Sequence, residues 1–168
     1  MDDVFKKRRS VRRFQKQEGE EDFVFFFPLA IAREIEPEKL KEILEAAHSS
    51  PSAGDLKARE IIVIKDKKVR EKLAEAALGQ DFIAEAPVVL IFFSIGSRSA
   101  QKYGKRGKNL YALQDATISA SFAWLQAVIL GLSGCWVGAF EESRVKDILG
   151  IKEDWRPIAI LPLGYSME

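Results

Sequence analysis

The feature that most constrains the fold is a segment that would be apolar on nearly every side of a helix. Residues 109–130 are predicted to form one long helix that ends at Gly131. Such a helix lies in the centre of a molecule or of a dimer, because it has no polar face to turn toward water. Ser119, Ser121 and Gln126 interrupt its apolar run, so we do not expect a membrane span.

Composition bounds the remaining possibilities. The 168 residues suffice for one compact domain and are too few for two ordinary ones. A net charge of +1 argues against a surface built for nucleic acid or an anionic membrane. The single cysteine, Cys135, excludes an internal disulfide and suits a reducing compartment. No secretory signal opens the chain, so we expect a cytoplasmic protein.

Helices and strands alternate along the chain. Pro37 is expected to begin a helix, Asp66 to cap a second that reaches Leu78, and Gly150 to end a short helix over residues 142–149. Four short β-rich runs are predicted as strands, namely 60–65, 88–93, 135–139 and 157–163. The alternation alone favours a parallel α/β sheet. A mixed or antiparallel sheet has the same order of elements, so the strand direction stays open.

The segment 18–31 carries an unusual phenylalanine-rich run at residues 23–27. An exposed run of this kind would promote aggregation. We therefore expect it to be covered by the core, by a partner subunit or by a cofactor ring; a lid over the substrate is the alternative. No repeat or linker marks a second domain, and we interpret the segment as an insertion in a single domain.

Few side chains are available for direct catalysis. The chain has one histidine, His48, and one cysteine. These are too few for a His/Cys metal cluster, and they leave only one possible Cys–His pair. No Gly-x-Ser-x-Gly elbow, phosphate-binding P-loop or Gly-x-Gly-x-x-Gly motif occurs. We interpret His48 as the last-turn residue of a helix, where the dipole favours it. If the protein is an enzyme, a cofactor is expected to carry the chemistry, with no catalytic side chain.

Three short segments offer binding groups instead. Arg8, Arg9 and Arg12 surround Ser10, and two guanidinium groups with a hydroxyl form a good phosphate clamp. The alternatives are a solvated basic terminus or a nucleic-acid contact. The small residues of the turn Pro51-Ser52-Ala53-Gly54 would let backbone amides approach a flat ligand, or simply form a turn. Trp136-Val137-Gly138-Ala139 could direct an amide at a ring nitrogen, or simply form a core strand.

In their order and spacing, these three segments resemble the nitroreductase-like flavoproteins. Pro162-Leu163-Gly164-Tyr165 is similar to the closing strand of that family, so the resemblance extends from about residue 5 to residue 165. It implies an α+β fold with a central mixed or antiparallel sheet flanked by helices, in an intertwined homodimer. It also implies FMN at the subunit interface, with NAD(P)H as co-substrate, in a single FMN-binding domain over residues 1–168. No partnership with nucleic acid or a membrane is expected.

The resemblance also implies roles for individual residues. Arg8, Arg9 and Ser10 would hold the phosphate and ribityl chain, and Arg12 would reach the ribityl chain or the pyrimidine edge of the flavin. Pro51, Ser52 and Ala53, from the partner chain, would cover the ring, and Gly54 and Asp55 are counted with them as cofactor-binding residues. The segment 136–139 would lie along the flavin, with the N–H of Gly138 donating to N5.

The sequence differs from the family pattern in three places. Asp55 and Lys57 stand where the family often has Asn and Gln. Basic residues that many members place after the closing strand are not in the sequence, so the N-terminal arginines would hold most of the phosphate. Help is expected from a loop over residues 97–108, with the candidates Arg98, Lys102, Lys105 and Arg106. The phenylalanine-rich insertion is not part of the common pattern.

The resulting hypothesis is an oxidoreductase that transfers hydride from NAD(P)H, through FMN, to nitroaromatics, quinones or similar flat acceptors. A relative that uses the same flavin for dehalogenation, substrate oxidation or flavin breakdown is an alternative. A non-catalytic module whose basic N-terminus contacts nucleic acid is another. The near-neutral charge, and the lack of aromatic residues among the arginines, weigh against that module.

Overall fold

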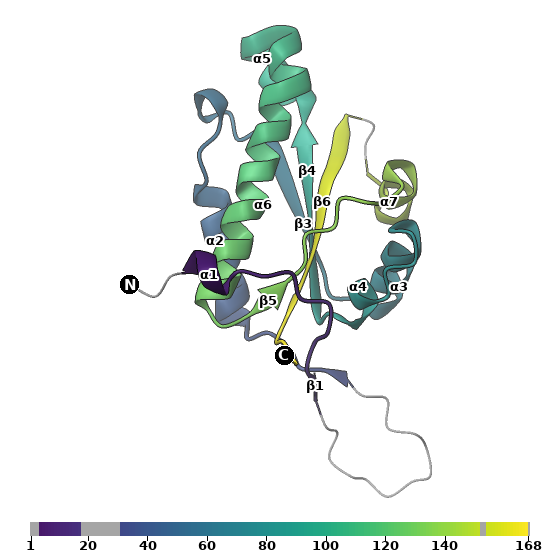
Figure 1. The fold of residues 1–168 in the computed structure, drawn as a ribbon. Helices are drawn as coiled ribbons and strands as arrows, with labels where there is room; N and C mark the ends of the chain where they lie inside the picture. The colour runs from purple at the N-terminus through teal and green to yellow at the C-terminus, as the bar shows by residue number, and fades with distance from the viewer. Residues whose placement is uncertain (1–3, 18–30, 152–153, 168) are drawn as a thin grey trace, which may run out of the picture.

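A computed structural model describes residues 4–17, 31–151 and 154–167 (Figure 1). The phenylalanine-rich run lies outside these residues, so its expected covering stays a prediction. On either side of it, β1 (Lys16–Gln17) and β2 (Ile31–Ala32) pair in antiparallel fashion. The short helix α1 (Val4–Lys7) precedes β1.

The main sheet has the strand order β3-β4-β6-β5 and is antiparallel at every pairing. Its strands are β3 (Arg59–Ile64), β4 (Val88–Ile95), β6 (Trp155–Gly164) and β5 (Ser133–Gly134). The parallel sheet suggested by the alternation is therefore wrong, and the antiparallel form of the α+β fold is confirmed. Between β3 and β4, two short helices replace one crossover helix, so the chain returns to the end of the sheet that it left.

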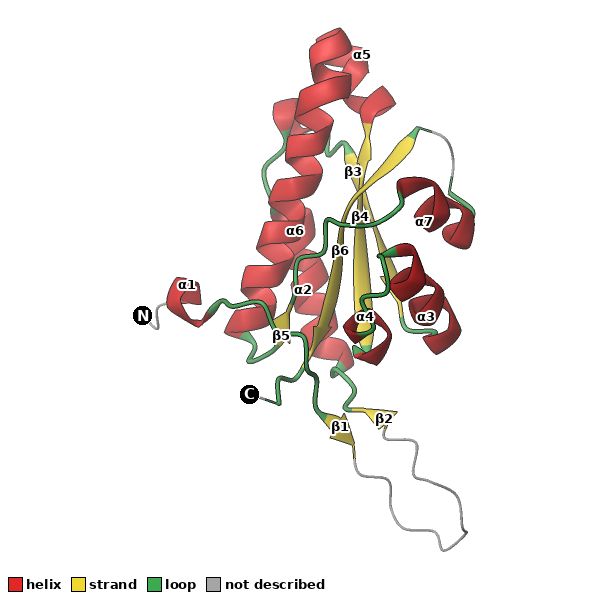
Figure 2. Cartoon of the chain, turned by 45° about the vertical axis from the view of Figure 1, so that its right-hand side comes forward, coloured by secondary structure: helices red, strands yellow, loops and turns green. Residues whose placement is uncertain are grey.

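Helices cover both faces of this sheet (Figures 1 and 2). One face carries α2 (Pro37–Ser49) and α6 (Ala112–Ile129). The other carries α3 (Lys67–Ala76), α4 (Phe82–Glu85) and α7 (Glu142–Leu149). Every residue of β4 is buried, and its side chains alternate between the two cores: Leu90 packs with α2 and α6, and Ile91 packs with α3, α4 and α7.

The predicted helix ends are mostly confirmed. Helix α2 begins at Pro37, and the Asp66 side chain caps α3 by accepting a hydrogen bond from Val69 N at 2.9 Å. Helix α7 ends before Gly150, which has a left-handed φ of 62°. The long helix α6 begins at Ala112, because the preceding residues, Gly107–Tyr111, are wound as a π-helix.

Two predicted segments differ in the structure. Residues 97–108, expected as a loop, belong largely to α5 (Gly96–Arg106). The strand expected at 135–139 contributes only an isolated bridge between Val137 and Ile160, and the regular pairing with β6 lies just before it, in β5. Cys135 N donates to the carbonyl of Pro162, whose own nitrogen has no hydrogen to return. The ladder is therefore interrupted between Gly134 and Val137.

A polar cluster joins the end of the chain to the start of α2. Tyr165 is 8% exposed; its hydroxyl donates to Glu36 and accepts from Lys39 Nζ at 2.7 Å. The guanidinium of Arg33 lies 3.6 Å from the centre of the Tyr165 ring. The hydrogen bond from Tyr165 lowers the pKa of Glu36 below its ordinary value.

Glu36→Gln is therefore expected to lower stability at neutral pH and to reduce its loss in acid. A carboxylate with a lowered pKa stabilises the folded state above its ordinary pKa, and this contribution is lost as the pH falls through the lowered value. Urea unfolding of both proteins at neutral pH and at about pH 3 measures this. A stability difference that is the same at both pH values would contradict the prediction.

Candidate functional site

The first part of the candidate site is an N-terminal strip, residues 8–14, laid along the edge of the main sheet. Val11 N donates to the carbonyl of Gly134 at 3.0 Å, and Ser10 forms a parallel bridge with the same glycine. Val11 and Phe14 are buried in the core, which fixes the strip. A Cβ on Gly134 would lie 2.8 Å from the Pro162 carbonyl oxygen, so only glycine permits this close approach.

The strip separates Arg8, a predicted phosphate ligand, from Arg12, which was expected at the ribityl chain or the pyrimidine edge of the flavin. The Arg8 guanidinium lies 4.7 Å from the ring centre of Trp124 on α6, and that of Arg12 lies 5.9 Å from the ring of Phe82 on α4. These rings belong to opposite faces of the sheet. Ser10 is exposed between the two arginines, and so is Arg9. The guanidinium groups of Arg8 and Arg12 thus lie on opposite sides of the strip.

The segment 136–139 follows the same edge of the sheet. Val137 is 2% exposed, so its side chain packs in the core. Its amide donates to the carbonyl of Ile160, so this N–H is already paired. Gly138 and Ala139 come directly after this pairing and are exposed, and Trp136 is half-buried. Gln80 Nε2 donates to the carbonyl of Ala139 at 3.1 Å and holds the segment against the turn before α4. The exposed backbone available to a ligand therefore begins at Gly138.

The turn at residues 51–55 forms the second part of the site, at the start of α6. It includes the short 3₁₀ helix Ala53–Asp55. Gly54 and Asp55 in the turn, and Lys57 just after it, have left-handed φ values of 61°, 55° and 47°. Asp and Lys in this region carry strain that the surroundings must offset. The turn therefore needs an anchor.

Asp115, in the first turn of α6, is that anchor. Its Oδ1 accepts from Ala53 N at 2.9 Å and its Oδ2 accepts from Ala58 N at 3.3 Å, while the residue is 2% exposed. We did not single out this residue from the sequence. The available signal was that it is the only charged residue between positions 109 and 130.

Arg59 supports the same turn from the side of α2. It is 4% exposed, and its Nη2 donates to the carbonyls of His48 at 2.8 Å and Ser50 at 3.0 Å, which end the helix. Burial lowers the pKa of this guanidinium. His48 thus contributes its carbonyl at a helix end, as expected of a last-turn residue.

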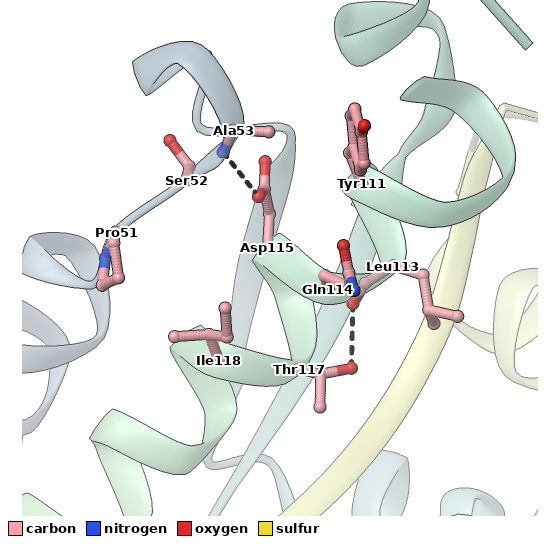
Figure 3. A pocket seen from close by; sticks show the side chains of 9 residues that line it. All are labelled: Pro51, Ser52, Ala53, Tyr111, Leu113, Gln114, Asp115, Thr117 and Ile118. Atoms are coloured by element: carbon pink, nitrogen blue, oxygen red, sulfur yellow. Dashed lines mark hydrogen bonds between the residues drawn. The ribbon is translucent and has the colours of Figure 1, made fainter. Parts of the chain in front are cut away.

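A hollow of about 600 Å³ opens between this turn and the first two turns of α6 (Figure 3). Tyr111 stands at its upper rim, and Asp115 lies at its back with the bond to Ala53 N. Its lining consists of Pro51, Ser52, Ala53, Tyr111, Leu113, Gln114, Asp115, Thr117 and Ile118. Most of this surface is apolar, which suits a flat ring more than a free anion.

The two parts of the site lie at opposite ends of α6 (Figure 1). Asp115 anchors the turn, and Trp124 lies beneath Arg8. Their separation of nine positions in the sequence corresponds to about 14 Å along the helix axis. One protomer therefore does not bring the N-terminal strip and the 51–55 turn around one small ligand.

Comparison with known proteins identifies the family. The model of the nitroreductase family matches residues 32–80 and 75–165, and the chain belongs to this family. A Clostridium difficile structure described as an FMN-dependent nitroreductase is 28% identical, with a TM-score of 0.79 over 100% of this chain and 88% of that chain. The family predicted from the ordered motifs is thereby confirmed.

Two sequence relatives agree with this assignment. A protein of Methanocaldococcus jannaschii with a nitroreductase name is 40% identical over 108 residues, which are 64% of this chain and 53% of that protein. A Bacillus subtilis protein named FMN reductase [NAD(P)H] is 38% identical over 147 residues, covering 80% of this chain and 59% of its own length. The chain thus spans between half and three fifths of these two relatives.

The described residues of the first part fit a phosphate monoester. Arg8 and Arg9 directly precede Ser10 in the chain, and Arg9 and Ser10 are exposed. Beneath Arg8, the buried Trp124 Nε1 finds no acceptor among the described residues. Such a set of donors is the chemistry that FMN requires at its phosphate end.

Within the part of the chain that the structure describes, no helix is long and apolar enough to cross a bilayer.

Proposed function

We propose that this protein is a cytoplasmic, FMN-dependent oxidoreductase that uses NAD(P)H to reduce nitroaromatics, quinones or similar flat acceptors. Residues 1–168 would act as a single FMN-binding domain with residues 18–31 inserted. The observation that carries the proposal is the position of the cationic strip and the exposed amide of Gly138 along one sheet edge, in a chain of the nitroreductase family.

Bound FMN would supply hydride transfer in both directions, and the protein would bind and orient it. Arg8, Arg9 and Ser10 hold the phosphate and the ribityl chain by charge-assisted hydrogen bonds. Arg12, on the other side of the strip, places a cation toward the ribityl chain or the pyrimidine edge, where negative charge develops on reduction. Gly138 offers its N–H to the ring, beside Trp136, Val137 and Ala139. No side chain acts as a nucleophile.

A homodimer would complete the site. The turn 51–55 is too far along α6 to reach the N-terminal strip of its own chain, so Pro51, Ser52, Ala53, Gly54 and Asp55 cover the flavin bound mainly by the partner. The solvent side of α6 supports this arrangement, because it is apolar and only partly covered: Phe122 is 39% exposed and Ile129 is 62% exposed. Ile118 and Leu125 continue the stripe at helical spacing.

Phe122→Glu is expected to convert the dimer into monomers and to release FMN. A charge placed at the centre of an apolar interface costs several kcal/mol, on the order of 3–5, when no partner neutralises it. Light scattering after gel filtration measures the mass, and absorbance measures the flavin. Leu78→Glu, at a side chain that is 67% exposed on the opposite face, is the matched control and keeps the wild-type mass. A wild-type chain that is monomeric while holding FMN would overturn the dimer.

Identification of the chromophore tests the proposed function. The purified protein is expected to be yellow, to release FMN on heating, and to oxidise NAD(P)H when a nitroaromatic or quinone is added. A colourless protein that takes up no added FMN would refute the flavin assignment. Bound FMN without turnover of these acceptors would instead favour other redox chemistry on the same flavin.

A further inference from the structure

A basic surface lies next to the hollow, at the opposite end of α6 from the N-terminal strip of the same chain (Figure 1). Most of its residues were expected to help hold the phosphate, and the proposed flavin site does not use them. Between residues 96 and 114 the chain has five basic residues and no acidic one; they are Arg98, Lys102, Lys105, Arg106 and Lys108. Arg98 pairs with Glu60 at 2.6 Å, while the other four are exposed. This part of the chain, α5 and the π-helix after it, projects beyond the sheet above α6 (Figure 1). Its positive potential therefore extends over the mouth of the hollow.

Two of these cations lie at the rim of the hollow. A Cβ on Gly54 would lie 3.0 Å from Lys102 Nζ, so this ammonium group rests against the 51–55 turn. On the other side, Arg106 Nε donates to the Tyr111 hydroxyl at 2.9 Å, and Tyr111 lines the hollow. Each cation thus contacts a residue that lines or adjoins the hollow.

A pair of tyrosines lies between these cations. The rings of Tyr103 and Tyr111 pack edge to face, with centroids 5.1 Å apart, and both residues are half-buried. Lys102 Nζ lies 5.5 Å from the Tyr103 ring centre, and the Arg106 guanidinium lies 5.4 Å from that of Tyr111. We name these four residues, Lys102, Tyr103, Arg106 and Tyr111, the α5 rim.

The acidic groups close to the rim are already engaged. Asp55, next to Gly54, is paired with Lys57 at 3.9 Å, and Asp115 accepts from the amides of Ala53 and Ala58. Neither neutralises Lys102 or Arg106 through an ion pair among the described residues. An aromatic surface with two cations available at its edge suits a ligand that has both a flat ring and a dianionic phosphate.

We propose that the α5 rim binds the adenosine 2′-phosphate end of NADPH and makes this protein prefer NADPH to NADH. A tyrosine face stacks on the adenine, and Arg106 and Lys102 bind the 2′-phosphate, which NADH lacks. The hollow beside the rim leads toward the flavin that the 51–55 turn would cover. The inference rests on the proposed function for its choice of a nicotinamide nucleotide as the ligand.

The test compares nucleotides that differ by this phosphate. The double variant Lys102→Gln/Arg106→Gln is expected to raise the KM for NADPH about tenfold, with less than about a twofold change for NADH. Calorimetry with 2′,5′-ADP and 5′-AMP measures the same preference without turnover. Wild type is expected to bind 2′,5′-ADP about tenfold more tightly, and the double variant to bind both alike. Tyr111→Leu removes both the stacking surface and the hydroxyl that accepts from Arg106, so it should weaken both nucleotides, and 2′,5′-ADP at least as much as 5′-AMP.

The matched control is Lys68→Gln/Lys72→Gln, which removes two exposed charges from α3 on the other face of the sheet. It should leave the preference of wild type unchanged; an equal loss in this control would overturn the inference, because the effect would then reflect net charge. Equal binding of 2′,5′-ADP and 5′-AMP to wild type would overturn it as well. A protein without flavin that still prefers 2′,5′-ADP would refute the proposed function and support the rim, whereas a flavoprotein without this preference would refute the rim alone.

Discussion

Replacing both Arg8 and Arg12 with alanine is expected to weaken FMN binding by about 3–6 kcal/mol, since each charge-assisted hydrogen bond contributes about 1.5–3 kcal/mol. Even the lower value is a loss of more than about a hundredfold in affinity. Removal of Arg8 should have the larger effect of the two. In the proposed site, Arg8 binds the doubly charged phosphate of FMN, whereas Arg12 lies toward the ribityl chain or the pyrimidine edge. Titration of the apoprotein with FMN, followed by flavin fluorescence, measures each dissociation constant.

The geometry also predicts how the two substitutions combine. Arg8 lies over Trp124 on one face of the sheet and Arg12 lies near Phe82 on the other, with the buried Val11 between them. Side chains without a shared partner act independently, so the two losses should add to within about 0.5 kcal/mol. Arg8→Lys keeps the charge but loses the bidentate fork, and should fall between wild type and Arg8→Ala.

Lys41→Ala/Lys68→Ala serves as the control, because it removes the same charge from exposed positions on α2 and α3. Its FMN affinity should match that of wild type. If the Arg8/Arg12 double variant keeps wild-type affinity, the strip is only a solvated basic segment and the phosphate assignment is wrong.

The helix ends could be predicted from sequence because their causes are local. The Asp66 cap, Pro37 in the first turn and Gly150 after α7 each act within one turn of the helix that they bound. The direction of the strands has no such local cause. It depends on α3 and α4 returning the chain to the end of β3, and the same order of elements would also fit a parallel sheet.

Helix α5 was missed for a related reason. Its glycines suggest a loop, and it has no long apolar stripe. In the structure, α5 is kinked at Gly104, whose backbone is not helical (φ 55°, ψ −139°), and a Cβ on Gly107, the first residue of the π-helix, would lie only 2.4 Å from the carbonyl oxygen of Ser99. Ser99 is completely buried at that contact. Gly104 thus interrupts α5, and Gly107 lets the chain after the kink pack closely against Ser99.

For the site, the sequence predicted the segments that face a ligand but not the residues that hold them. The motifs at residues 8–12, 51–55 and 136–139 follow from the order of the family pattern. The residues Asp115 and Arg59, by contrast, bind backbone groups whose positions depend on the tertiary fold. A single charge in an otherwise apolar helix is the signal that reveals such an anchor, since a buried carboxylate requires donors.

Asp115→Asn is expected to destabilise the protein by about 2–4 kcal/mol, an effect as serious as the loss of a large core side chain. The amide has one oxygen for two backbone donors, so either Ala53 N or Ala58 N faces an NH₂ group. The strained backbone at Asp55 and Lys57 then loses its constraint. Urea unfolding of Asp115→Asn beside Asp147→Asn, an exposed position on α7, measures the difference; the control should change by less than about 0.5 kcal/mol.

A double-variant cycle separates the hydrogen bonds of Asp115 from its charge. The Asp115 carboxylate opposes the lowering of the Arg59 pKa more than Asp55 or Glu60 does, so its removal leaves the buried guanidinium with less compensation. Arg59→Met/Asp115→Asn should therefore be less destabilised than the sum of the single variants, by about 1 kcal/mol or more. Strict additivity would show that Asp115 acts on the turn through its hydrogen bonds alone. If Asp115→Asn is as stable as wild type, the turn that faces the hollow is held by something other than this anchor.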